Sequence, residues 1–91
     1  VVVEVHPELS FATMCGHVLP SKHGAAGAAA RIDAVEAWRS DAVAALDRRP
    51  TRVPIVDALD ALAALWTAIR FRDGRARVIP PDAVAAPRVV V

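Results

Sequence analysis

Residue types that often report a specialised chemistry are scarce in this 91-residue chain. Cys15 is the only cysteine, so an intramolecular disulfide is excluded. Tyrosine is absent, the aromatic residues are two tryptophans and two phenylalanines, and Lys22 is the only lysine. Because large core side chains are few, the chain can build one small domain with a modest core and no more.

Signals for a membrane or for export are also missing. No apolar run approaches the roughly 20 residues that span a bilayer. The valine-rich start lacks the positively charged region of a signal peptide. A formal net charge of +1 provides no global electrostatic argument for nucleic-acid binding. We therefore expect a cytoplasmic protein with no membrane partner.

Alanine dominates what is present. It occupies 20 positions and inflates the 55% hydrophobic content, although it favours helix more than it fills a core. A domain built this way is expected to be marginal by itself. The sequence thus favours a partner, either a missing N-terminal half or a second copy of the chain.

Hydrophobic periodicity and helix-breaking residues predict an α/β chain. The β-branched run Val1–Val5 predicts a central strand, and Ala76–Ile79 and Arg88–Val91 predict two further strands. We expect Val1–Val5 and Ala76–Ile79 to be parallel neighbours joined by a right-handed helical crossover. A loop is expected at residues 82–87. Four segments have helical patterns: residues 8–15, about 25–38, 41–46 and about 54–72.

The last of these helices has two distinct faces. One is an apolar stripe and the other is small except for two acids. The stripe consists of Ile55, Leu59, Leu62, Trp66 and Ile69. The second face consists of Asp57, Asp60, Ala64 and Thr67.

Three acidic residues are the candidate catalytic and metal-binding groups. Asp57 and Asp60 are three residues apart, so they share a helix face close to the N-terminus, where acids are also ordinary helix stabilisers. Glu4 is flanked by valines and is expected either to point off an edge strand into water or to lie beside a site at the strand end. Hard cations prefer carboxylate oxygens, and a pair of such ions can cleave a phosphodiester. Glu4, Asp57 and Asp60 thus predict a site for Mg²⁺ or Mn²⁺.

Other polar residues allow simpler explanations. Seven of the ten arginines form two groups, within residues 48–52 and 70–77, which are either solvated helix ends or phosphate contacts. The spacing of Cys15 and the three histidines matches no standard zinc pattern. Trp38 and Trp66 lie at helical spacing, which favours core residues over platforms for base stacking.

Four sequence blocks in a fixed order resemble a known family. They are EVHPELSF at residues 4–11, LPSKH at 19–23, Gly27 with Arg31, and DALDA at 57–61. Together they resemble the C-terminal half of the predicted ribonuclease-H-like nucleases that are grouped as domain-of-unknown-function family 429. The resemblance runs from Glu4 to about Pro81.

This resemblance implies a fold and a set of roles. Residues 1–91 would be a single partial ribonuclease-H-like domain, with two or three strands and three to four helices, that lacks the first three strands. Glu4 would be the acid of the fourth strand, and Asp57 and Asp60 would be the helical acids. Lys22 and Arg31 match basic positions of the family and would contact substrate phosphate.

The resemblance also implies a missing ligand. In that fold an aspartate of the first strand lies at the centre of the metal site, and no aspartate of this chain lies in a strand-like run that could replace it. We expect a metal-dependent nuclease of DNA or RNA in a truncated form that is inactive alone. The alternative is a non-catalytic interaction or oligomerisation module that uses an exposed strand edge and the stripe from Ile55 to Ile69.

Overall fold

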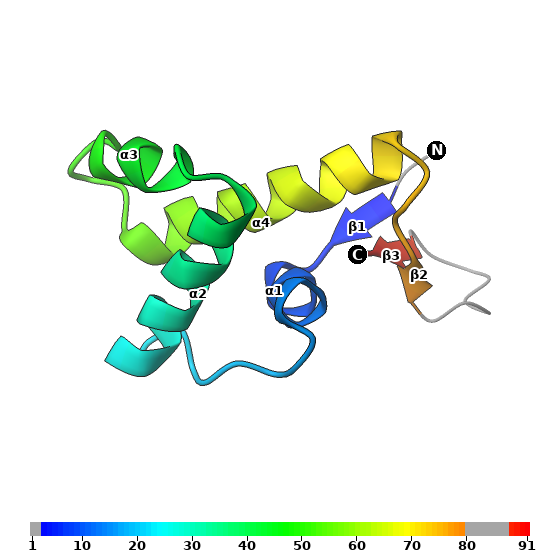
Figure 1. Cartoon of the computed structure of the whole chain (residues 1–91), viewed down its shortest axis with the longest axis horizontal. Helices are drawn as coiled ribbons and strands as arrows, with labels where there is room; N and C mark the ends of the chain where they lie inside the picture. The colour runs from blue at the N-terminus through cyan, green and yellow to red at the C-terminus, as the bar shows by residue number, and fades with distance from the viewer. Residues whose placement is uncertain (1–2, 80–87) are drawn as a thin grey trace.

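The computed structural model describes residues 3–79 and 88–91, in which helices and a small sheet follow one another along the chain (Figure 1). These residues form an α/β structure with four helices and three strands, as the sequence predicts. The predicted strand residues Val1 and Val2 and the predicted loop at 82–87 lie outside the described residues. The elements are β1 (Val3–Val5), α1 (Pro7–Cys15), α2 (Ala25–Trp38), α3 (Ala42–Asp47), α4 (Ile55–Arg72), β2 (Val78–Ile79) and β3 (Arg88–Val90).

Local residue chemistry explains where the helices begin and end. Pro7 opens α1, where its fixed φ suits the first turn and its missing N–H costs nothing. Gly16 closes α1 with a φ of 79°, and its N–H donates to the carbonyl oxygen of Ala12. Pro54 precedes α4, and Gly74, with a φ of 72°, follows it. The predicted helices are therefore confirmed to within about two residues.

The strand order differs from the prediction. The sheet has the order β1-β3-β2, with β1 parallel to β3 and β2 antiparallel to β3. The expectation that Val1–Val5 and Ala76–Ile79 are parallel neighbours is wrong, because β3 lies between them. Only residues 80–87 connect β2 to β3, which is too short for a parallel crossover, so β2 and β3 pair as antiparallel strands.

The position of β1 is a second correction. The run Val1–Val5 is predicted to be a central strand, but β1 lies at an edge of the sheet that the described residues form. The central place belongs to β3, where Val90 is 1% exposed and Val91, directly after the strand, is fully buried. A strand at an edge leaves one row of backbone donors and acceptors without a partner strand.

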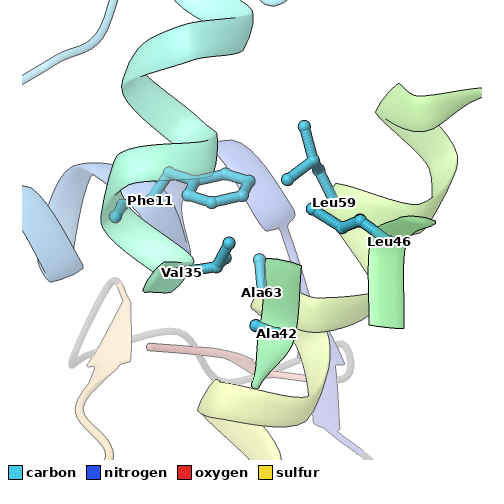
Figure 2. Packing of buried hydrophobic residues seen from close by; sticks show 7 residues of the cluster. Phe11, Val35, Ala42, Leu46, Leu59 and Ala63 are labelled. Atoms are coloured by element: carbon cyan, nitrogen blue, oxygen red, sulfur yellow. The ribbon is translucent and has the colours of Figure 1, made fainter. Parts of the chain in front are cut away.

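The hydrophobic core lies among the helices, away from the sheet (Figures 1 and 2). Every helix contributes to it, and three of its members are alanines, so the helix backbones approach one another closely. The cluster consists of Phe11, Ala34, Val35, Ala42, Leu46, Leu59 and Ala63. Phe11, Val35 and Leu59 are fully buried and provide most of its volume. None of the helices within residues 3–79 is long and apolar enough to cross a membrane.

The face of α4 that enters the core matches the predicted stripe in part. Leu59 is fully buried and Ile55 and Leu62 pack against the core, but Ala63 and Thr67 are fully buried as well. Thr67 is predicted on the face of the two acids, but its hydroxyl lies 2.6 Å from that of Ser10 across the contact between α1 and α4. A buried hydroxyl needs such a partner, because an unsatisfied one is costly.

The loop before α2 packs directly on the helix backbone. A Cβ atom placed on Gly27 would overlap the carbonyl oxygen of Ser21 and would lie 2.7 Å from that of Pro20. Glycine at position 27 therefore allows the loop to approach α2 more closely than any side chain would permit. This contact determines where the neighbouring residue Lys22 lies.

We predict that Gly27→Ala lowers the free energy of unfolding by about 2 kcal/mol or more, because the overlap outweighs the gain of about 1 kcal/mol in helix propensity. Gly24→Ala is the matched control: its Cβ would meet the same Ser21 oxygen at an ordinary 3.6 Å. It should cost less than about 1 kcal/mol. Urea denaturation followed by circular dichroism measures both. Equal losses in the two variants would contradict the close approach.

Candidate functional site

Asp60 is the predicted site residue with the most informative surroundings. It lies in the second turn of α4, and its Oδ2 accepts a hydrogen bond from Lys22 Nζ at 3.0 Å. Both side chains are about three-quarters buried. The other oxygen, Oδ1, is shielded from solvent and has no hydrogen-bond partner among the described residues. One oxygen of the Asp60 carboxylate is therefore hydrogen-bonded and the other is not.

The ion pair also affects the titration of Lys22. The hydrogen bond that Lys22 donates to Asp60 raises the pKa of the Lys22 ammonium above its ordinary value of 10.5, and the charges of Asp60 and Glu8 act in the same direction. Partial desolvation and the positive charge of Arg31 oppose this increase. Lys22 thus lies among three charged groups that come from α1, α2 and α4.

Glu4 and Asp57 are placed differently. Glu4 lies on β1 with its side chain 53% exposed, and its Oε2 is 3.4 Å from Nε2 of His6, which is equally exposed. Glu4 therefore matches the first of its two expected placements, on an edge strand facing water. Asp57 lies in the first turn of α4 and is exposed.

The structure does not gather the three predicted ligands into a closed metal site. Among residues 3–79 and 88–91, no group of three or more acidic, histidine or cysteine side chains is arranged to hold a metal ion. The fold places the Asp60 carboxylate next to the Lys22 ammonium, whereas Glu4 lies next to His6. The assignment of Glu4, Asp57 and Asp60 as joint ligands of Mg²⁺ or Mn²⁺ stays a prediction.

Arg31 is the most buried charged residue of the described chain, with a side chain that is 3% exposed. Its guanidinium holds both carboxylate oxygens of Glu8. It also donates to the carbonyl oxygens of Pro20 at 2.7 Å and of Gly27 at 2.8 Å. The same group lies over the ring of Phe11, 5.6 Å from its centroid. Arg31 therefore joins α1, the loop and α2.

The partner of Arg31 was missed by reasoning from the sequence. Arg31 is four residues from both Gly27 and Val35, so it lies on the buried face of α2. An arginine on such a face needs an acid, because an unpaired buried charge is very costly. That rule predicts a partner but does not say which acid it is. Glu8 supplies the partner from the first turn of α1.

Lys22 and Arg31 are both engaged by carboxylates in this structure. Their predicted role as contacts for substrate phosphate stays a prediction. The two cationic side chains differ, however, in how freely they can move. Arg31 is enclosed, whereas Lys22 has a partly exposed side chain that carries its ammonium on a flexible stem.

The remaining arginines mostly bond to the protein itself. Arg49 donates to the carbonyl oxygens of Leu46 and Val53, which ties the end of α3 to the next connection. Arg39 and Arg72 pair with neighbouring aspartates on the surface. Both tryptophans are half-buried, and the guanidinium of Arg70 lies 4.7 Å from the centroid of Trp66. These contacts favour the interpretation of the arginine groups as residues at helix ends over their interpretation as phosphate contacts.

We predict that Arg31→Met destabilises the chain by about 3 kcal/mol or more, because it removes the donors that Arg31 supplies to the Glu8 carboxylate and to the carbonyl oxygen of Pro20. Arg39→Met is the matched control, since its guanidinium also makes a two-point contact with an acid, Asp41, but is half exposed. The control should change the urea midpoint little. Similar midpoints for the two variants would show that burial of Arg31 contributes nothing.

The sole lysine allows a direct test of its ion pair. We expect the Lys22 ammonium to titrate above 10.5, and the increase to disappear in Asp60→Asn, as measured by NMR of the ¹³C-methylated amine. A raised pKa in the folded state means that the pair stabilises the fold fully below the unfolded pKa of 10.5. This contribution is lost as pH rises through the higher folded value. An ordinary pKa in the wild type would contradict the ion pair.

Comparison with known proteins places the chain in a family. The family model described as "Protein of unknown function (DUF429)" matches residues 1–85. No curated protein matches the chain, and no solved structure matches it. The family match includes every helix and both β1 and β2, and with them Glu4, Lys22, Arg31, Asp57 and Asp60. The chain therefore belongs to the DUF429 family.

Proposed function

We propose that this chain is the C-terminal part of a metal-dependent nuclease domain of ribonuclease-H-like type, and that it is not competent for hydrolysis by itself. The observation that carries the proposal is the Asp60 carboxylate, with one oxygen shielded from water and lacking a partner. Desolvating such an oxygen without a partner costs free energy. A cation ligand at this oxygen would remove that cost.

Asp60 therefore fits the divalent cation that the proposal requires, and the other two acids fit it less well. Asp57 precedes Asp60 by three residues on the same helix and is free to turn towards a shared ion. Glu4 lies on β1, close to His6 rather than in a common ligand group. A divalent cation would lower the pKa of a bound water and stabilise the leaving oxygen of a phosphodiester.

The protein's own residues would then hold and position the nucleic acid. Asp60 and Asp57 supply negative charge at the start of α4, where the helix dipole compensates it. Lys22 supplies a positive charge next to these acids, which suits a phosphate group. A complete centre needs at least one more acid than the described residues bring together, and for this reason we propose that the chain alone is inactive.

The edge of β1 supports a second candidate function, that of an interaction module. Within the described sheet, β1 pairs only with β3, so its other edge is available to a strand from a missing half or from a second copy. In that case the acids are surface charges and helix stabilisers. The two functions differ in whether a divalent metal binds at Asp60.

We predict that Mn²⁺ stabilises the chain through Asp60. If the dissociation constant is about 1 mM, 10 mM Mn²⁺ adds about 1.4 kcal/mol, which raises the melting temperature by several degrees. Asp60→Asn should abolish this increase and Asp57→Asn should reduce it. Thermal unfolding with and without Mn²⁺ measures each variant.

Asp41→Asn is the control, because Asp41 is also paired with a cation but is exposed and lies at the start of α3. It should retain the full response to Mn²⁺. The wild-type chain should not cleave labelled DNA or RNA above the background of Asp60→Asn. If Mn²⁺ has no effect at 10 mM, and the melting temperature rises with protein concentration, the interaction module is the better account.

A further inference from the structure

We propose that Lys22 is a displaceable internal cation: its ammonium occupies the place of a divalent metal at the Asp60 carboxylate and leaves when the metal binds. This inference rests on the proposed function, because it concerns the regulation of the same site. Its consequence is that metal binding and release of the lysine are coupled, so that each opposes the other.

The first support is the uneven satisfaction of the carboxylate. The ammonium of Lys22 contacts Oδ2 only, at 3.0 Å, and leaves the buried Oδ1 without a donor among the described residues. An ammonium is a compact point charge and does not span two oxygens as a guanidinium does. A divalent cation can contact both oxygens of one carboxylate. The site is therefore filled by a group that satisfies it only in part.

The second support is that the backbone of Lys22 is held while its side chain is free. Arg31 bonds the carbonyl oxygen of Pro20, and the loop lies against Gly27, where no Cβ would fit. Solvent reaches the Lys22 side chain itself, which is 28% exposed. Lys22 can thus leave Asp60 by rotating its side chain, without moving the loop or unfolding α2.

The third support is a second, half-exposed acid on the elements that hold the loop of Lys22. Glu8 holds Arg31, and Arg31 bonds the carbonyl oxygen of Pro20, two residues before Lys22. A displaced Lys22 would therefore remain near a carboxylate. A released ammonium next to a bound metal is also free to contact a phosphate, as the proposed substrate requires.

The test uses the full chain, Mn²⁺ as the probe and electron paramagnetic resonance to measure free Mn²⁺. Lys22→Met removes the competing cation and should bind Mn²⁺ about three- to tenfold more tightly than the wild type. Lys22→Arg should bind it more weakly, because a guanidinium can engage both oxygens of Asp60. Asp60→Asn should not bind it at this site. Circular dichroism checks that each variant is folded.

A second measurement needs no substitution. Lys22 is the only lysine, so its ¹³C-methylated amine has a unique NMR signal. Titration with diamagnetic Mg²⁺ should move this signal towards that of Asp60→Asn as the site fills, because the ammonium then leaves the Asp60 carboxylate. The midpoint of the shift should coincide with the Mg²⁺ concentration that half-saturates thermal stabilisation.

The outcomes separate the two levels of the argument. Binding of Mn²⁺ that depends on Asp60, with equal affinity in wild type and Lys22→Met and an unmoved lysine signal, overturns the displacement and leaves the proposed function standing. Absence of binding in both proteins overturns the proposed function and the displacement together. Binding in Lys22→Met alone supports both, since the lysine then competes too strongly in the wild type.

Discussion

The buried guanidinium of Arg31 joins the parts of the chain that carry the candidate site. It holds the carboxylate of Glu8 on α1, the carbonyl oxygen of Pro20 in the loop and that of Gly27 on its own helix. A buried arginine is tolerable only when its donors are satisfied, so the positions of these acceptors are coupled. The position of Lys22 depends on this clamp, because the loop that carries Lys22 also contains one of its acceptors, Pro20.

The small core makes this clamp more important than it would be in a larger domain. Three of the seven residues of the helical cluster are alanines, and within it only Phe11, Val35 and Leu59 are both large and fully buried. Close packing replaces side-chain volume, and the loop likewise lies directly on the backbone of Gly27. The sheet adds little core of its own, since it lies beyond the helical cluster (Figure 1). Polar contacts such as the Ser10–Thr67 pair therefore have to be well satisfied.

The same arrangement explains why the candidate site at Asp60 is incomplete. Asp60 has one oxygen paired with Lys22 and one without a partner, and Glu4 lies half exposed on an edge strand. Both features are consistent with membership of the DUF429 family and with a proposed domain that has further strands beside β1. A strand added at that edge would pair with β1 next to Glu4, and an acid on it would be a candidate for the missing ligand.

Features that depend only on neighbouring residues follow from the amino-acid sequence alone. Pro7, Gly16 and Pro54 determine helix ends through their own backbone preferences, and the helices therefore lie close to where they were predicted. The order of the four sequence blocks also indicated the family, and it marked Asp60 and Lys22 before any contact between them was known. Such signals need no knowledge of where distant segments lie.

Which strands and side chains far apart in the sequence come into contact follows only from the folded structure. The central place of β3, the burial of Thr67 and the choice of Glu8 as the partner of Arg31 all involve residues far apart in the sequence. Periodicity identifies a buried face but not what covers it, and an acid on a helix can equally stabilise the helix, bind a metal or pair with a lysine. The packing of the loop against Gly27 brings one of these partners to Asp60, because the ammonium of Lys22, the only lysine of the chain, lies 3.0 Å from the carboxylate.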